Sequence, residues 1–392
     1  MRFLFLLTLI QLALCSINQK PFSNPVGQFL TPFSFEWVQL LEQFHNTLGN
    51  KSKDAECLFK LPKFDCPPFV WHDAIVDRDA YHLRPQDIKA VIAIGDSITA
   101  GFGMLSGRPP FSSALEYRGK VFSVGGDPGE YTIPNFLSTF TDLRGAPTGV
   151  TLPRSTGKQL DKAVSGAKTQ DLHSEVTRLT RLLNTEHYKS IKDEWKVITL
   201  FIGANNVCVL CTPPMTGLPG LAQADEFENN IRDVLERLRT DVGKSFVNLV
   251  ALFNVSSVYE ASRGDPYCEF VLDPNHMVIC SCIQHDENQR NAADRMIKEY
   301  NLRLQKLEKE FKHRDKNFGV SYQPGFADFP VAKYKQAYFS GFDCFHPNKC
   351  ANQVMALILW NNMFSSSMEK NRPFNIEMMN VTCPGPDRPY LQ

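Results

Sequence analysis

The stretch VIAIGDSITAGFG, residues 91–103, decides how the rest of the chain is interpreted. Its first four residues are apolar and indicate a buried strand, which runs directly into Gly95, Asp96 and Ser97. Small polar residues at the end of a strand either cap the helix that follows or present a hydroxyl to a substrate. The motif is not Gly-x-Ser-x-Gly, because Thr99 takes the place of the second glycine. Ser97 is therefore a helix cap or a nucleophile, and the rest of the chain has to decide.

Beyond this stretch, short apolar runs alternate with amphipathic segments. This alternation predicts an α/β fold of three layers, with a central, mostly parallel sheet between two layers of helices. In such sheets, sites form at the carboxyl ends of the strands. The expected strands are residues 90–94, 196–203, 245–253 and 318–324, and the expected helices are residues 169–185, 223–242, 287–315 and 350–364.

The two ends of the chain predict a secreted protein. The first residues, MRFLFLLTLIQLALCS, have one basic residue, an apolar run and small residues, as in a signal peptide (1–15); a buried N-terminal helix is the alternative. An extension (16–85), with a helix at 33–49, is expected to pack on the main domain (86–385), and a polar tail (386–392) follows. We expect neither a transmembrane anchor nor a lipid-anchor signal. Equal numbers of basic and acidic residues, 42 each, argue against nucleic acid as a partner.

The cysteines fit an extracellular location. Without Cys15 in the signal peptide, ten cysteines remain, and an even number in a secreted chain predicts disulfides, in one of about 945 pairings. A zinc site made by Cys208, Cys211, Cys280 and Cys282 is the alternative. The candidate acceptors for N-glycosylation are Asn50, Asn254 and Asn380.

Three further motifs can supply what a nucleophilic serine needs. In FDCFHPN (342–348), His346 can accept the serine proton and Asp343 can fix the tautomer of the imidazole. In FIGANN (201–206), the Asn205 amide follows a strand and can donate to an oxyanion. In AVSGAKT (163–169), Gly166 lets a backbone N–H approach a ligand closely. Each motif taken alone is also compatible with an ordinary turn.

Taken together, and in their order along the chain (Ser97, Gly166, Asn205, His346), the four motifs resemble the SGNH, or GDSL, esterase and lipase family. AIGDSITAG, KAVSGAKTQDL, EWKVITLFIGANNVC and DCFHPN are similar to its phospholipase B branch, and the resemblance covers most of residues 55–385. It implies a flavodoxin-like fold in which Ser97 is the nucleophile, His346 the general base and Asp343 its orienting partner. It also implies an oxyanion hole made by the backbone N–H groups of Ser97 and Gly166 and the side chain of Asn205. No metal or cofactor is implied.

The sequence departs from the family pattern at two positions. Asn206 stands where the family usually has Asp, and Asp161 stands where it often has Asn. We expect both changes to alter the hydrogen bonding around the site without abolishing activity.

The resemblance implies that the substrates are fatty-acyl esters of phospholipids or lysophospholipids at a lipid interface. The 29 phenylalanines fit an acyl pocket as well as an ordinary core. A GDSL esterase acting on other small or acetylated esters is the first alternative. A lipid-binding protein without catalysis is the second, although none of the expected site residues is missing.

Overall fold

The computed structural model describes residues 60–68, 78–105, 114–211, 221–273, 279–284, 286–327, 329–334, 339–372 and 375–392. The predicted signal peptide, the predicted helix at 33–49 and the acceptor Asn50 lie outside these residues, as does most of the predicted extension.

Four parallel strands form the centre of the molecule. They are β1 (Ile88–Gly95), β2 (Trp195–Phe201), β3 (Ser245–Val250) and β4 (Phe318–Gln323), hydrogen-bonded in this order. Almost every residue of all four is buried, which is why apolar residues predominate in each of them, most clearly in β1. The predicted strands and the predicted parallel sheet are confirmed.

An extended segment, residues 160–164, covers the outer edge of β1. The Ala93 N–H donates to the Leu160 carbonyl, the Lys162 N–H donates to Ala93, and the Val164 N–H donates to Gly95 at 3.0 Å. This segment comes second along the chain and lies outside β1. Counted as a fifth strand beside the four of the sheet, it would give the 2-1-3-4-5 order of flavodoxin-like folds.

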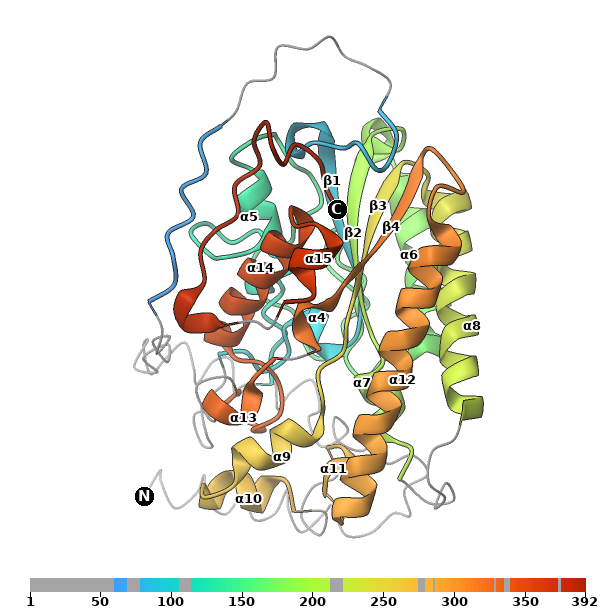
Figure 1. The fold of residues 1–392 in the computed structure, drawn as a ribbon. Helices are drawn as coiled ribbons and strands as arrows, with labels where there is room; N and C mark the ends of the chain where they lie inside the picture. Colours follow the sequence, from blue (N-terminus) through green and yellow to red (C-terminus); the bar gives the residue numbers. More distant parts are fainter. Residues whose placement is uncertain are drawn as a thin grey trace, which may run out of the picture.

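Helices cover both faces of the sheet (Figure 1). One layer consists of α6 (Leu172–Leu183), α8 (Leu221–Arg237) and α12 (Glu287–Phe311), and the other contains α14 (Lys349–Met363) and α5 (Ile133–Leu137). The structure thus has the three predicted layers.

Two of the predicted helix boundaries need correction. The helix expected over 287–315 ends at Phe311, because Lys312 is extended and His313 has a positive φ of 58°. The helix expected over 169–185 starts with a 3₁₀ turn at Thr169–Asp171 before α6 begins.

Short helices fill most of the connections, and several lie at the carboxyl edge of the sheet. Their four to seven residues are too few to show helical periodicity in the sequence. They are α4 (Ser97–Ala100), α7 (Ala204–Cys208), α9 (Ser256–Ser262), α10 (Pro266–Val271), α11 (Ser281–Gln284), α13 (Val331–Tyr334) and α15 (Ser367–Lys370). Further 3₁₀ or π turns lie at Pro85–Asp87, Arg118–Lys120, Lys189–Ile191, Leu238–Val242, Pro324–Phe326 and Ile376–Met378.

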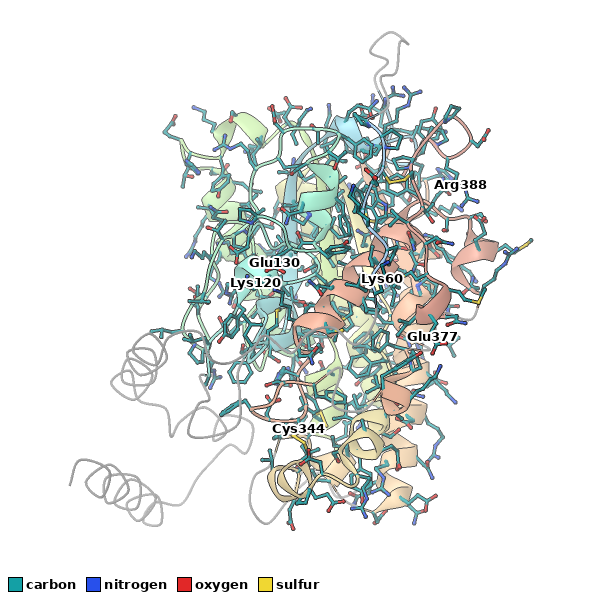
Figure 2. The ribbon with its side chains drawn as sticks, turned by 90° about the vertical axis from the view of Figure 1, so that its left-hand side faces the viewer. Lys60, Lys120, Glu130, Cys344, Glu377 and Arg388 are labelled. Atoms are coloured by element: carbon teal, nitrogen blue, oxygen red, sulfur yellow. A yellow bond between two sulfur atoms is a disulfide. The ribbon has the colours of Figure 1, made fainter. Side chains whose placement is uncertain are left out.

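Disulfides tie these connections together. The bonds are Cys66–Cys383, Cys208–Cys280, Cys211–Cys282 and Cys268–Cys344, and Cys350 is disulfide-bonded as well. The bond at Cys344 lies near the lower end of the molecule in Figure 2. Because the four cysteines of the zinc alternative are paired with one another as disulfides, that alternative is wrong.

Both ends of the described chain pack on the sheet domain. Phe64 stacks on Phe136 at 4.1 Å and meets the Trp360 ring at 5.1 Å. At the other end, the Leu391 N–H donates to the Leu83 carbonyl at 2.8 Å. Of the helices that the structure describes, none is long and apolar enough to cross a membrane.

Candidate active site

The backbone at the end of β1 fixes the position of Ser97. Gly95 has a φ of +153°, and a Cβ there would come within 2.2 Å of the Phe201 carbonyl oxygen, so no larger residue fits. Asp96 caps α4 by accepting a hydrogen bond from the Ile98 N–H at 3.0 Å. Ser97 is the first residue of that helix. Asp96, and not Ser97, is therefore the residue that caps the helix. The Ser97 hydroxyl is available for another partner.

That partner is His346, which links Ser97 to Asp343. His346 Nε2 lies 2.7 Å from Ser97 Oγ, and His346 Nδ1 lies 2.5 Å from Asp343 Oδ2. Asp343 is fully buried, whereas Ser97 and His346 are 7% and 6% exposed. A carboxylate that accepts from Nδ1 leaves Nε2 free to take the proton of the hydroxyl. The arrangement can therefore activate Ser97 for attack on a carbonyl carbon.

The loop that carries Asp343 and His346 is held at several points. Asp343 Oδ1 accepts hydrogen bonds from the backbone N–H groups of Phe345 and His346 at 2.9 and 3.0 Å. The Ser340 N–H donates to the His346 carbonyl at 2.7 Å, and Cys344 is bonded to Cys268. The carboxylate thus shapes its own loop with one oxygen and orients the imidazole with the other.

A second Asp-x-x-His pair occurs at Asp79 and His82, where the carboxylate lies 2.8 Å from Nδ1. Its side chains are 40% and 56% exposed. The pair precedes β1, at the amino edge of the sheet, and His82 packs on Tyr390. Spacing alone therefore does not identify the pair at the site; its burial and its contact with Ser97 do.

Gly166 and Asn205 meet at one turn near the end of β1. The Ala167 N–H donates to the Val164 carbonyl at 2.9 Å, and Gly166 has a φ of +86°, which the third position of a type II turn requires. Asn205 Nδ2 donates to the Ala167 carbonyl at 2.9 Å and keeps a second N–H. Over the described residues, the backbone N–H groups of Ser97 and Gly166 donate no hydrogen bond. These donors are the ones the sequence predicted for an oxyanion hole.

The two departures from the family pattern have partners of their own. Asn206 accepts from the Thr169 N–H at 3.0 Å and donates to the Thr169 hydroxyl at 3.2 Å. Asp161 forms an ion pair with Arg118 at 2.7 Å. Sequence reasoning missed Arg118 and its other partner, Glu116, because they lie in a loop without a recognisable motif.

Burial shifts the pKa values of two acids next to Ser97. Burial raises the pKa of Asp96 to about 6, although the Ile98 N–H and the charge of His346 oppose the shift. Burial also raises the pKa of Glu175 well above its usual value; its Oε2 accepts from the Gly95 N–H at 2.9 Å. Burial thus favours the protonated form of Glu175, whose hydrogen bond to Gly95 holds the end of β1.

An apolar pocket lies next to the Asp343–His346 loop. It is a small hollow of about 20 Å³, and Pro347, the residue after His346, borders it. Phe253, Phe326, Phe329 and Phe339 line it together with Ala351. Four of the many phenylalanines thus surround one hollow beside the site.

The two candidate glycosylation sites in the described part of the chain differ in exposure. Asn380 is exposed, and Asn254 is half-buried before α9. Glycosylation at either position stays a prediction.

Comparison with known proteins gives one family. A family model described as GDSL-like lipase/acylhydrolase matches residues 91–359. The chain is similar to membrane-associated phospholipase B1 of Homo sapiens, with 30% identity over 333 residues, which are 81% of this chain and 22% of that protein. It is also similar to membrane-associated phospholipase B1 of Mus musculus, with 29% identity over 354 residues, which are 84% of this chain and 23% of that protein. The chain thus spans about a fifth of the length of these relatives.

Two solved structures are similar at low identity. One is Axe2, an acetylxylan esterase from Geobacillus stearothermophilus, with 16% identity and a TM-score of 0.36 over 70% of this chain and 94% of that one. The other is the lipase Lip_vut3 from a goat rumen metagenome, with 17% identity and a TM-score of 0.37 over 69% of this chain and 95% of that one.

Proposed function

The chain belongs to the GDSL-like lipase/acylhydrolase family and is a carboxylic ester hydrolase, and from this premise we propose that it cleaves the fatty-acyl esters of glycerophospholipids and lysophospholipids. The single observation that carries the proposed mechanism is the hydrogen-bonded series from Asp343 through His346 to Ser97. The distant similarity to phospholipase B1 and the apolar pocket beside Pro347 support the choice of substrate.

In the proposed reaction, Ser97 is the nucleophile. His346 Nε2 takes the hydroxyl proton as Oγ attacks the ester carbonyl carbon, and Asp343 stabilises the imidazolium that forms. The carbonyl oxygen becomes an oxyanion, to which the N–H groups of Ser97 and Gly166 and the Asn205 amide donate. Donors of this kind are worth about 3–4 kcal/mol each in the transition state.

The intermediate then collapses. The bond from carbon to the alcohol oxygen breaks, and His346 returns the proton to that oxygen, so a lysophospholipid or a glycerophosphodiester leaves. A water molecule, deprotonated by His346, attacks the acyl-serine ester, and the fatty acid is released with Ser97 restored.

We place the acyl chain along the apolar lining of this pocket. A fatty-acyl chain gains free energy from leaving water in proportion to its apolar area, and the pocket is lined by phenylalanine and aliphatic side chains next to the proposed base.

We also propose that the protein acts outside the cell. The disulfides support this, because such bonds persist in oxidising compartments. The signal peptide predicted at residues 1–15 gives the same location.

The test compares fatty-acid release from phosphatidylcholine, lysophosphatidylcholine and a short-chain ester by the wild type and by Ser97→Ala. We expect the wild type to release acyl chains from both lipids and the variant to lose activity by several orders of magnitude. Cleavage of the short-chain ester alone would keep the mechanism and refute the lipid substrate. Lipid binding without any ester cleavage would favour the non-catalytic alternative.

A further inference from the structure

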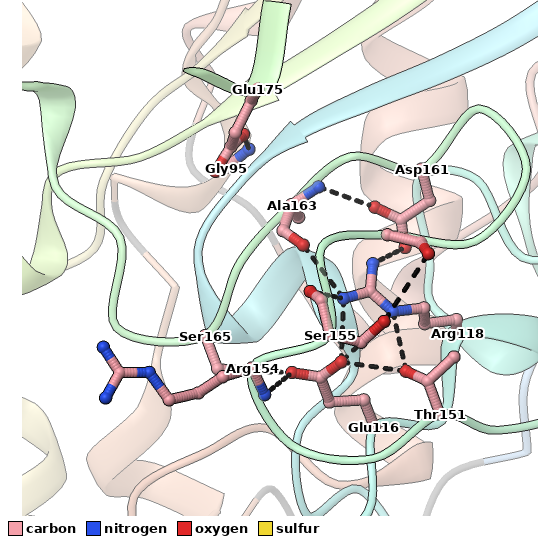
Figure 3. A network of polar contacts seen from close by, with 11 residues as sticks. Gly95, Glu116, Arg118, Thr151, Arg154, Ser155, Asp161, Ala163, Ser165 and Glu175 are labelled. Carbon is pink, nitrogen blue, oxygen red and sulfur yellow. Dashed lines mark hydrogen bonds and ion pairs between the residues drawn. The ribbon is translucent and has the colours of Figure 1, made fainter. Parts of the chain in front are cut away.

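Three buried charged side chains form a cluster near the donors of the proposed oxyanion hole. Glu116, Arg118 and Asp161 are fully buried. The Arg118 guanidinium donates to each carboxylate at 2.7 Å (Figure 3). Taking charges out of water is costly, so a buried cluster of this kind contributes little net stability and has value mainly through the geometry it imposes.

The remaining donors of Arg118 reach three loop positions. Nε donates to the Thr151 hydroxyl at 2.9 Å, and Nη2 donates to the carbonyls of Ala163 and Ser155 at 2.9 and 3.1 Å. The guanidinium is thereby surrounded by fixed acceptors, as Figure 3 shows. One side chain holds several irregular segments in register with each other.

On one side, the cluster holds the segment that leads to Gly166. Asp161 accepts from the Ala163 N–H at 3.0 Å, Arg118 donates to the Ala163 carbonyl, and Ser165 Oγ donates to Glu116 Oε1 at 2.6 Å. Residues 162 and 164 use their backbones to pair with β1 instead. The segment is thus fixed on both sides, and Ser165 is the last anchored residue before Gly166.

On the other side, the cluster holds the segment that leaves Ser97. The Phe102 N–H donates to the Ser97 carbonyl at 2.9 Å, and the Tyr117 N–H donates to the Gly101 carbonyl at 2.9 Å. Phe102 also forms a bridge with Glu116 itself. The same glutamate therefore contacts both chain segments that carry the backbone donors of the proposed oxyanion hole.

We propose that the Glu116–Arg118–Asp161 cluster is a positioning device that fixes the Gly166 N–H relative to the Ser97 N–H, with the Ser165 hydroxyl as its last link. The inference rests on the proposed function. An oxyanion hole acts only if its donors are aimed at the place where charge develops, so a loosened Gly166 turn weakens transition-state binding and leaves substrate binding intact. Asp161, which stands where the family often has Asn, is then the second anion of the device.

The test is Ser165→Ala, which removes the last link and leaves the ion pairs in place. With a p-nitrophenyl ester at pH 8, we expect kcat to fall by about tenfold to hundredfold with KM unchanged. Ser97 adds to the carbonyl carbon of a trifluoromethyl ketone and forms a tetrahedral oxyanion. We expect the affinity for this inhibitor to fall by the same factor. We expect Ser165→Thr, which keeps the hydroxyl, to recover most of kcat.

The matched control is Ser321→Ala on β4, which also loses one buried hydroxyl contact, here with Lys370 Nζ at 3.0 Å. We expect kcat and inhibitor affinity to stay at wild-type values in this variant. Equal losses in both alanine variants, or a kcat within about twofold of wild type in Ser165→Ala, would overturn the positioning role while Ser97-dependent hydrolysis stands. Hydrolysis that does not depend on Ser97 would refute the proposed function, and this inference with it.

Discussion

Asp343→Asn gives the sharpest test of the proposed mechanism, because the structure fixes how the new amide must sit. Asp343 Oδ1 accepts from two backbone N–H groups, those of Phe345 and His346. In the variant the amide oxygen has to stay there, so the NH₂ group faces His346 Nδ1. The imidazole must then accept at Nδ1 and carry its proton on Nε2, which is the wrong tautomer for taking the proton of Ser97.

The size of the effect follows from the cost of turning the amide around. The reverse orientation would leave two buried N–H groups without acceptors, at about 1–3 kcal/mol each. The active orientation is therefore disfavoured by about 2–6 kcal/mol, which corresponds to a loss in kcat of about thirtyfold to about 10⁴-fold. The melting temperature should change little, because both backbone hydrogen bonds remain.

The assay is the initial rate on p-nitrophenyl butyrate between pH 5 and pH 9. Asp79→Asn is the matched control, since it makes the same change in an Asp-x-x-His pair at the amino edge of the sheet. We expect that variant to have wild-type rates. An Asp343→Asn enzyme with kcat within about threefold of wild type would refute the reasoning about the tautomer.

Three further predictions concern pH, a disulfide and substrate length. Asp96 and Asp161 have folded-state pKa values raised by burial to about 6, so the folded protein holds more protons than the unfolded chain between pH 4 and pH 6. The contribution of these two groups to the free energy of unfolding should fall as pH rises through this window, by on the order of 2–3 kcal/mol for each group. Ion-paired acids such as Glu228 and Glu369, whose pKa values are lowered to about 2, act in the opposite direction, so the measurement is the difference in urea between the wild type and Asp96→Asn. Replacing Cys66 and Cys383 with serine opens a link across 317 residues and should lower the free energy of unfolding in urea by about 2–5 kcal/mol. Ala351→Leu narrows the apolar pocket and should lower kcat/KM for a long-chain ester about tenfold relative to a butyrate ester.

Each of these has an outcome that would contradict it. If the free energy of unfolding of Asp96→Asn varied between pH 4 and pH 6 as that of the wild type does, burial would not be holding Asp96 in its protonated form. A double serine variant as stable as the wild type would mean that the link constrains the unfolded chain little. Equal effects of Ala351→Leu on long and short esters would place the acyl chain elsewhere.

The parallel sheet could be predicted because its strands lie between two layers of helices. Burial on both faces makes residues 90–94 a uniform apolar run, and a run of this kind is the clearest signal a strand can give. The extended segment 160–164 gave no such signal. It contains Asp161 and Lys162, both buried, and polar residues of this kind normally indicate a surface loop.

Some residues of the candidate site could likewise be predicted from the sequence, and others could not. Ser97, His346 and Asn205 could be proposed from sequence because each belongs to a motif with a required order along the chain. Arg118 could not, because an isolated arginine in a loop is nearly always at the surface. The disulfide pairing could not be predicted either, since it depends on which loops meet at the carboxyl edge of the sheet.

The hydrogen bond between Ser97 and His346 spans 249 residues of sequence, and this has a consequence during synthesis. Ser97 is made well before His346, and until the loop around His346 folds against it the hydroxyl is an ordinary alcohol. Long-range contacts of this kind form late in folding. A nascent chain therefore holds its proposed nucleophile in an inert form, and ester cleavage becomes a direct reporter that the whole domain has closed.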